Sequence, residues 1–209
     1  MGNFDGGRFD GKVSIVTGAG QGIGEGYAHA LAREGASVVV ADINDENAAN
    51  VVAAIEAEGG TALAVHVDVS DPDSCIAMAA ATVERFGRID HLVNNAAIYH
   101  SMEINGLLRI DLDYYRKFMD VNMNGAIYAT RAVWRELRKQ EGAAVVNQSS
   151  TAAWMAAGFY GVAKAALNSI TINLAAEMAS MGIRVNAIAP GPTNTEATQL
   201  ISGGEENFG

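Results

Sequence analysis

The sequence is poor in the residue types on which several protein classes depend. A single cysteine, Cys75, cannot form an internal disulfide and is expected to be a small buried side chain on a helix. Fourteen lysines and arginines stand against 24 acidic residues, giving a formal charge of −10, and no basic cluster is present that would bind nucleic acid. The 4 histidines are scattered without the spacing of metal ligands, so no metal site is predicted.

Long apolar segments are missing as well. No apolar run reaches the roughly 18 residues that a membrane-spanning helix needs, and the first residues lack the apolar core of a secretory signal. Hydrophobic residues nevertheless make up 49% of the 209 residues, which is enough for a substantial core. We therefore expect a single cytoplasmic domain over residues 1–209 that binds neither membranes nor nucleic acid.

Short β-branched runs alternate along the chain with longer, alanine-rich amphipathic stretches. This alternation is typical of βαβ units, and it predicts an α/β fold with a doubly wound, Rossmann-type parallel sheet and helices on both faces. Strands are expected at Val13–Thr17, Ser37–Ala41, Thr61–Val67, His91–Val93, Ala144–Asn147 and Ile183–Ile188. Helices are expected near residues 22–34, 45–58, 72–86, 112–139 and 160–181.

A glycine-rich turn follows the first expected strand. Residues 17–24 read TGAGQGIG, and glycines at such a turn let the backbone approach a pyrophosphate at the N-terminus of the next helix. The spacing is T-G-x-x-x-G-x-G rather than the G-x-G-x-x-G of the general dinucleotide-binding turn. Its position directly after a first strand favours nucleotide binding over a purely structural turn.

A carboxylate stands at the end of the second expected strand. Asp42 follows Gly18 by 24 residues, where a carboxylate accepts hydrogen bonds from the adenosine ribose hydroxyls and repels a 2′-phosphate. The alternative role is a cap for the following helix, although Asn44 and Asp45 are nearer to that position. Asp42 therefore favours NAD over NADP.

Tyr160 and Lys164 are four residues apart in an expected helix, which places both side chains on one face. A phenol with a pKa of about 10 is a poor acid–base catalyst at neutral pH. An ammonium group beside it stabilises the phenolate and lowers that pKa toward the working range. The pair follows the strand end Asn-Gln-Ser-Ser, in which Ser149 or Ser150 is placed to hydrogen-bond a substrate oxygen.

Together these motifs resemble the short-chain dehydrogenase/reductase family, from about residue 10 to residue 197. Asn-Asn-Ala-Ala at residues 94–97 is similar to the family's Asn-Asn-Ala-Gly, and a Pro-Gly pair at 190–191 follows the sixth strand as in relatives. The chain departs from the family at three places. Alanine replaces the last glycine of the asparagine motif, Thr193 stands where isoleucine or valine is common, and the loop 151–159 is about three residues shorter.

The resemblance implies a catalytic set and a cofactor site. Ser150, aligned on the strand end, would hold the substrate oxygen, with Ser149 as the alternative, and Tyr160 would exchange a proton with that oxygen. Lys164 would also hold the nicotinamide ribose, and Asn122 would anchor the water of a proton relay. The implied NAD-binding residues are Gly18, Gln21, Gly22, Ile23, Gly24, Asp42, Asp68, Val69, Asn95, Ala96, Tyr160, Lys164, Pro190, Gly191, Thr193 and Thr195.

The resemblance also implies an activity and an assembly. NADP-preferring relatives carry a basic residue where this chain has Gln21 or Ile43, so NAD is the expected cofactor. The expected reaction is hydride transfer between nicotinamide and a secondary alcohol or ketone, and the apolar loop 151–159 favours an apolar or cyclic substrate. Relatives pair through the helices expected at 112–139 and 160–181, which predicts a homodimer or homotetramer.

Family members continue for some tens of residues beyond the matching part, through a substrate lid. Residues 198–209 are accordingly interpreted as an incomplete lid region. The alternative function is a catalytically impaired nucleotide-binding or scaffold protein that lost turnover with this lid. The intact set of asparagine, serine, tyrosine and lysine argues against that alternative, because a protein that only binds nucleotide does not need all four.

Overall fold

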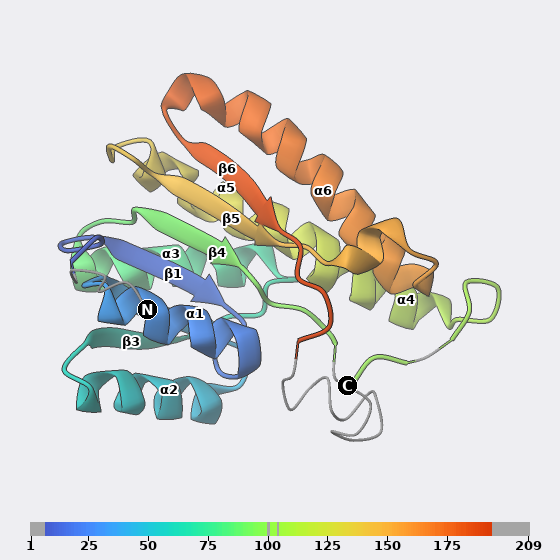
Figure 1. Cartoon of the computed structure of the whole chain (residues 1–209), viewed down its shortest axis with the longest axis horizontal. Coiled ribbons are helices and arrows are strands. Elements are labelled where there is room, and N and C mark those ends of the chain that lie inside the picture. The colour runs from blue at the N-terminus through green and yellow to red at the C-terminus, as the bar shows by residue number, and fades with distance from the viewer. Residues whose placement is uncertain (1–6, 100, 104, 194–209) are drawn as a thin grey trace.

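A computed structural model of the chain describes residues 7–99, 101–103 and 105–193 (Figure 1). Thr195 and the expected lid region at 198–209 lie outside these residues. Within the described residues the chain folds into a parallel sheet with helices on both faces, which confirms the predicted fold class. No described helix is both long and apolar enough to cross a membrane.

The six described strands lie in the order β3-β2-β1-β4-β5-β6, and all neighbouring pairs are parallel. The order reverses beside β1, where Val16 pairs with Val40 of β2 on one side and with Val93 of β4 on the other. In doubly wound sheets of this order, ligands bind at the carboxyl ends of the strands beside the reversal. The strands are β1 (Val13–Thr17), β2 (Ser37–Asp42), β3 (Thr61–His66), β4 (His91–Asn94), β5 (Ala144–Gln148) and β6 (Arg184–Ile188).

Two layers of helices cover the sheet (Figure 1). Side chains alternate between the faces of a strand, so Val16 of β1 packs in the first layer and Ile15 in the second. Neither side chain is exposed to solvent. The first layer contains α1 (Gly22–Arg33) and α2 (Asp45–Ala57), and the second contains α3 (Pro72–Phe86), α5 (Gly125–Leu137) and α6 (Gly158–Met178).

The helix expected at 112–139 is interrupted. Two α-helices, α4 (Leu112–Met119) and α5, are joined by a π-helical turn over Asp120–Asn124. Single π turns inside α-helices often occur at functional sites. The expectation of one continuous α-helix is therefore wrong at this turn, because hydrophobic periodicity does not resolve one added residue. Other boundaries shift slightly; β3, for example, ends at His66 rather than Val67.

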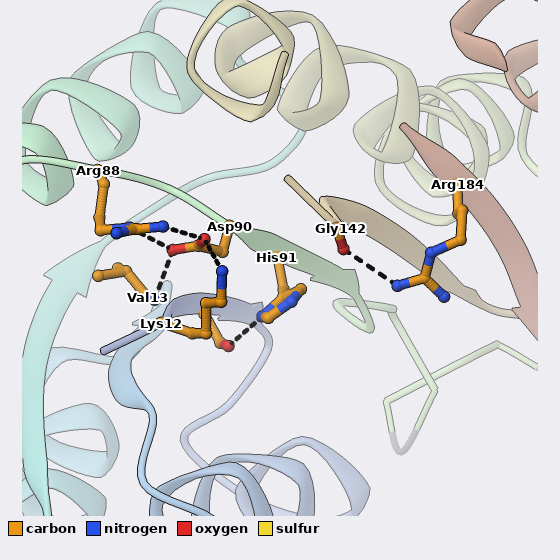
Figure 2. A network of polar contacts seen from close by, with 8 residues as sticks. Lys12, Val13, Arg88, Asp90, His91, Gly142 and Arg184 are labelled. Atoms are coloured by element: carbon orange, nitrogen blue, oxygen red, sulfur yellow. Dashed lines mark hydrogen bonds and ion pairs between the residues drawn. The ribbon is translucent and has the colours of Figure 1, made fainter. Parts of the chain in front are cut away.

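A network of polar contacts joins the amino ends of β1 and β4 (Figure 2). Only 1% of Asp90 is exposed, and its carboxylate accepts hydrogen bonds from Arg88 Nε at 2.8 Å, Arg88 Nη2 at 2.7 Å and the Val13 N–H at 2.9 Å. Lys12 Nζ lies 3.3 Å from the same carboxylate. Burial alone would raise the pKa of Asp90, but the donors around it hold that pKa below its usual range.

Candidate active site

The carboxyl ends of the strands border a cleft of about 510 Å³. Its walls come from the ends of β1, β2, β4 and β5, from the start of α1 and from α6. Every described residue that the sequence assigns to catalysis or to the cofactor lines this cleft, except Asn122. Segments far apart in the sequence therefore meet at one site, as the topology of the sheet requires.

The glycine turn after β1 fits a phosphate group. Gly18 adopts a left-handed backbone conformation, with φ of +63°, that a side chain would strain. A Cβ atom at Gly24 would collide with the carbonyl oxygen of Gly18, so the start of α1 packs against the turn only because this residue is glycine. Gln21, at the N-cap of α1, makes no side-chain capping bond. The first N–H groups of the helix thus border the cleft without a side-chain partner, as a bound pyrophosphate requires.

Asp42 is nearly buried, with 9% of its surface exposed, at the end of β2. Its two oxygens accept hydrogen bonds from the Gly20 N–H at 2.8 Å and from the Asn44 N–H at 2.9 Å. The helix cap is Asn44, whose side chain accepts from the Asn47 N–H at 3.0 Å. A carboxylate has about four acceptor positions, so Asp42 keeps further acceptor capacity while it anchors the glycine turn.

Asn95, after β4, and Asp68, after β3, both line the cleft. The Asn95 amide donates to the carbonyl oxygens of Thr17 at 3.0 Å and Gly18 at 2.9 Å, which fixes the glycine turn to the end of β4. Asp68 accepts from both the N–H and the hydroxyl of Ser70, at 2.9 and 2.6 Å. Both side chains therefore have structural roles in addition to bordering the cleft.

Tyr160 lies near the start of α6, and its phenol hydrogen-bonds with the Ser150 hydroxyl. The ring of Tyr99 packs against it, with ring centroids 5.4 Å apart. Burial raises the pKa of the Tyr160 phenol above its ordinary value; the Ser150 hydrogen bond opposes this and Tyr99 adds to it. The lowering of this pKa by Lys164, expected from the sequence, is not found in this geometry.

The ammonium group of Lys164 is held away from the phenol by the main chain. Only 2% of Lys164 is exposed, and its Nζ donates to the carbonyl oxygen of Gln148 at 2.7 Å. The Nζ atom lies 5.8 Å from the centroid of the Tyr160 ring. Burial lowers the pKa of Lys164 to about 8, so the ammonium form still predominates at neutral pH.

The two candidate serines differ in their partners. Ser149 is buried, and its hydroxyl donates to Asn168 Oδ1 at 2.6 Å. The Ser150 hydroxyl accepts from the Ala152 N–H at 3.2 Å and contacts the Tyr160 phenol. Of the two alternatives, Ser150 is the one beside the tyrosine, in agreement with the alignment on the strand end.

Asn122 lies behind the cleft rather than in it. Its amide nitrogen donates to the Phe118 carbonyl oxygen at 3.1 Å, and its buried Oδ1 has no hydrogen-bond partner. A small cavity of about 10 Å³ is bordered by Asn122, Asn94 and Lys164. The buried Oδ1 of Asn94 likewise has no partner. A polar cavity of this size suits about one water molecule.

The structure adds residues that the sequence did not identify. Gln148, Tyr99, Tyr114 and Lys117 line the cleft. The polar side chain of Gln148 at the end of a strand is a signal that could have pointed to this residue. Tyr114 and Lys117 lie in α4, and no sequence pattern shows that this helix borders the cleft. The apolar loop 151–159 differs from expectation, because its Trp154 is 71% exposed and does not line the cleft.

Comparisons with known proteins agree with this geometry. The family described as short chain dehydrogenase matches residues 12–206. An uncharacterized oxidoreductase of Mycobacterium tuberculosis is 59% identical over 197 residues, which cover 94% of this chain and 79% of that protein. A 3-oxoacyl-[acyl-carrier-protein] reductase of Synechocystis is 39% identical, covering 91% of this chain and 78% of the reductase.

A solved structure has the same architecture. The crystal structure of a dehydrogenase/reductase from Sinorhizobium meliloti superposes with a TM-score of 0.84 at 34% identity, covering 90% of this chain and 75% of that one. The family match therefore spans nearly the whole described chain, and the fold and the glycine turn agree with it. This chain belongs to the short-chain dehydrogenase/reductase family of oxidoreductases.

Proposed function

We propose that this enzyme transfers a hydride between NAD(H) and a secondary alcohol or ketone. The observation that carries the proposal is the meeting of Tyr160, Ser150 and Lys164 in one cleft with the glycine turn and Asp42. The three side chains suit proton transfer to a substrate oxygen. The glycine turn and Asp42 suit the phosphate and ribose groups of a dinucleotide.

The residues of the cofactor half fit a bound NAD. The start of α1 would receive the pyrophosphate, Asp42 would accept the adenosine ribose hydroxyls, and Lys164 would reach the nicotinamide ribose. Asp68, Val69 and the main chain at 95–96 would border the adenosine, and Pro190, Gly191 and Thr193 would border the nicotinamide. Nicotinamide supplies the hydride chemistry, which is a property of the cofactor.

The protein's own contribution is the handling of a proton at the substrate oxygen. The Tyr160 phenol carries its proton at neutral pH and would donate it to a ketone oxygen; burial, which raises its pKa, favours this protonated form. The Ser150 hydroxyl beside it would donate a hydrogen bond to the same oxygen. Lys164, with a pKa lowered to about 8, would return a proton to the phenol, and the unpaired Oδ1 of Asn122 would hold the water that resupplies Lys164 from the small cavity behind the cleft.

NAD rather than NADP is the proposed cofactor. Asp42 borders the cleft where the adenosine ribose would lie, and a 2′-phosphate beside this carboxylate would be repelled. The neighbouring positions Gln21 and Ile43, which also line the cleft, carry no positive charge to offset that repulsion. The substrate is proposed to be apolar or cyclic, because the apolar side chains of Ile98 and Tyr99 line the cleft beside Tyr160.

A homodimer or homotetramer is the proposed assembly. The outer face of α6 exposes apolar side chains, among them Val162 at 41% and Ile172 at 71% exposure. Such a row on a long helix is typical of a surface covered by another chain. Sedimentation at micromolar concentration is expected to give a dimer or larger species, and a monomer would contradict this proposal.

The direct test of the function is NADH formation with a panel of secondary alcohols. We expect steady-state absorbance increases at 340 nm with at least one apolar or cyclic alcohol in the panel. The same panel with simple sugars is the comparison for substrate class. Tight NADH binding without turnover of any alcohol or ketone would contradict catalysis and leave nucleotide binding as the function.

A further inference from the structure

Gln148, the last residue of β5, connects two helices that lie on opposite faces of the sheet. Its main-chain oxygen accepts the Lys164 ammonium of α6 at 2.7 Å. Its side-chain Oε1 accepts the hydroxyl of Tyr27, in α1, at 2.6 Å. Only 7% of Gln148 is exposed, and the residue lines the cleft between the glycine turn and Tyr160.

In its bond to Tyr27 the Gln148 amide presents its oxygen to α1. A carboxamide has one acceptor oxygen and one NH₂ donor group, and they lie on opposite sides of the amide carbon. Because Oε1 faces the Tyr27 hydroxyl, the NH₂ group is turned away from α1. Among the described residues no partner takes a hydrogen bond from this NH₂ group, although the side chain borders the cleft.

Tyr27 can donate this hydrogen bond throughout the working pH range. Burial raises the pKa of its phenol above the ordinary value, so the hydroxyl keeps the proton that it donates. The residues are 121 positions apart in the sequence, and no covalent or helical constraint brings them together. The pair is therefore a tertiary contact that fixes a donor at the edge of the cofactor cleft.

We propose that Gln148 is a cofactor-binding residue whose NH₂ group donates to an oxygen of the nicotinamide half of the dinucleotide, and that Tyr27 is the positioning residue that orients it. The cleft wall at Gln148 lies between the start of α1, which suits the pyrophosphate, and Tyr160, beside which the nicotinamide must react. An amide donor at this point reaches either a phosphate oxygen or the carboxamide oxygen. This inference rests on the proposed dinucleotide function.

A double-mutant cycle of Gln148→Met and Tyr27→Phe tests the proposal. Methionine keeps the length of the side chain without its donor, and phenylalanine keeps the ring without its hydroxyl. A neutral hydrogen bond contributes about 1 kcal/mol, so Gln148→Met should weaken NADH binding about fivefold and Tyr27→Phe by a smaller factor. The double variant should bind as weakly as Gln148→Met alone, because both changes remove the same donor.

Two ligands and one control variant sharpen the readout. ADP-ribose lacks the nicotinamide, so weaker binding of both ADP-ribose and NADH assigns the donor to a phosphate, and weaker binding of NADH alone assigns it to the carboxamide. Tyr128→Phe, a half-buried tyrosine of α5 outside the cleft, should leave both affinities unchanged. Fluorescence titration supplies the Kd values, and thermal unfolding reports the fold of each variant.

The outcomes separate this inference from the proposed function. Unchanged NADH affinity in Gln148→Met and Tyr27→Phe, or additive effects of the two, overturns the inference and makes the pair a structural contact only. Failure of the parent enzyme to bind NADH overturns the proposed function and this inference with it. If Gln148→Met does not fold, Gln148→Glu keeps the acceptor for Tyr27 but loses the donor, and it must also weaken NADH binding.

Discussion

The two ends of the sheet use polar side chains in opposite ways. At the amino end, Asp90 is surrounded by Arg88, Lys12 and the Val13 N–H, and both of its oxygens have partners (Figure 2). At the carboxyl end, the buried Oδ1 atoms of Asn94 and Asn122 have none. A satisfied network favours one rigid arrangement, whereas unpaired buried groups cost stability and persist where a ligand or a water uses them.

Polar contacts at the amino end of these strands therefore stabilise the fold, whereas residues at the carboxyl end border the candidate active site. β4 begins beside Asp90 and ends at Asn94, within 4 residues of sequence. Side chains at its amino end join it to β1, and side chains at its carboxyl end reach the cleft and the cavity behind it. Substitutions at the two ends should consequently separate loss of activity from loss of stability.

The largest expected effect is at the carboxyl end. Tyr160→Phe removes the proton donor and keeps the ring, and general acid catalysis contributes up to about 10⁴-fold. We expect kcat to fall by about 10³-fold, equivalent to about 4 kcal/mol in the barrier, with NADH affinity and thermal stability nearly unchanged. Turnover within about tenfold of the parent would remove Tyr160 from this role.

At the amino end the expected effect is on folding. Asp90→Ala leaves the buried Val13 N–H and the Arg88 guanidinium without their acceptor, and should lower the free energy of unfolding by about 3 kcal/mol. The matched control is Asp113→Ala, which breaks an exposed pair with Arg116 and should cost less than about 1 kcal/mol. Urea unfolding measures both; equal losses would mean that burial of the Asp90 network contributes nothing.

A smaller effect is expected for cofactor choice. One charge-assisted hydrogen bond contributes about 1.5–3 kcal/mol, so the parent should prefer NAD over NADP by roughly ten- to a hundredfold in kcat/KM. Asp42→Ala should reduce this preference, and adding Gln21→Arg should shift it toward NADP. Because Asp42 also accepts the Gly20 N–H, Asp42→Asn serves as a control that keeps an acceptor for the turn. Equal kcat/KM values for NAD and NADP in the parent would mean that Asp42 only stabilises the turn.

The smallest expected effect is a pH dependence of stability from Asp90. The pKa of Asp90 in the folded protein is lower than its value of about 3.9 in the unfolded chain. The carboxylate therefore contributes stability above that value, and the contribution is lost as pH falls through the folded pKa. Unfolding free energies of the parent and of Asp90→Asn should converge between about pH 5 and pH 2; a constant difference across that interval would contradict the lowered pKa.

Much of the fold and of the site was predictable because the relevant signals are local. The alternation of segments gave the parallel sheet, and the glycine turn and the Tyr160–Lys164 spacing identified elements whose ends meet in the cleft. The bond between Tyr27 and Gln148 was not predictable, since the two residues are 121 positions apart and no local pattern links them. The raised pKa of Tyr160 was missed because spacing shows that two side chains share a face but not what else they contact.

The π-helical turn at Asp120–Asn124 has a consequence for the phase of the helices around it. It acts as an insertion of one residue, and each residue of an α-helix advances about 100° around the axis. α4 and α5 are therefore rotated relative to one another by about that angle, so Phe118 packs with Phe159 while Val133 packs in the main core. A chain one residue shorter here would form a more regular helix, but it would lose one of these two alignments.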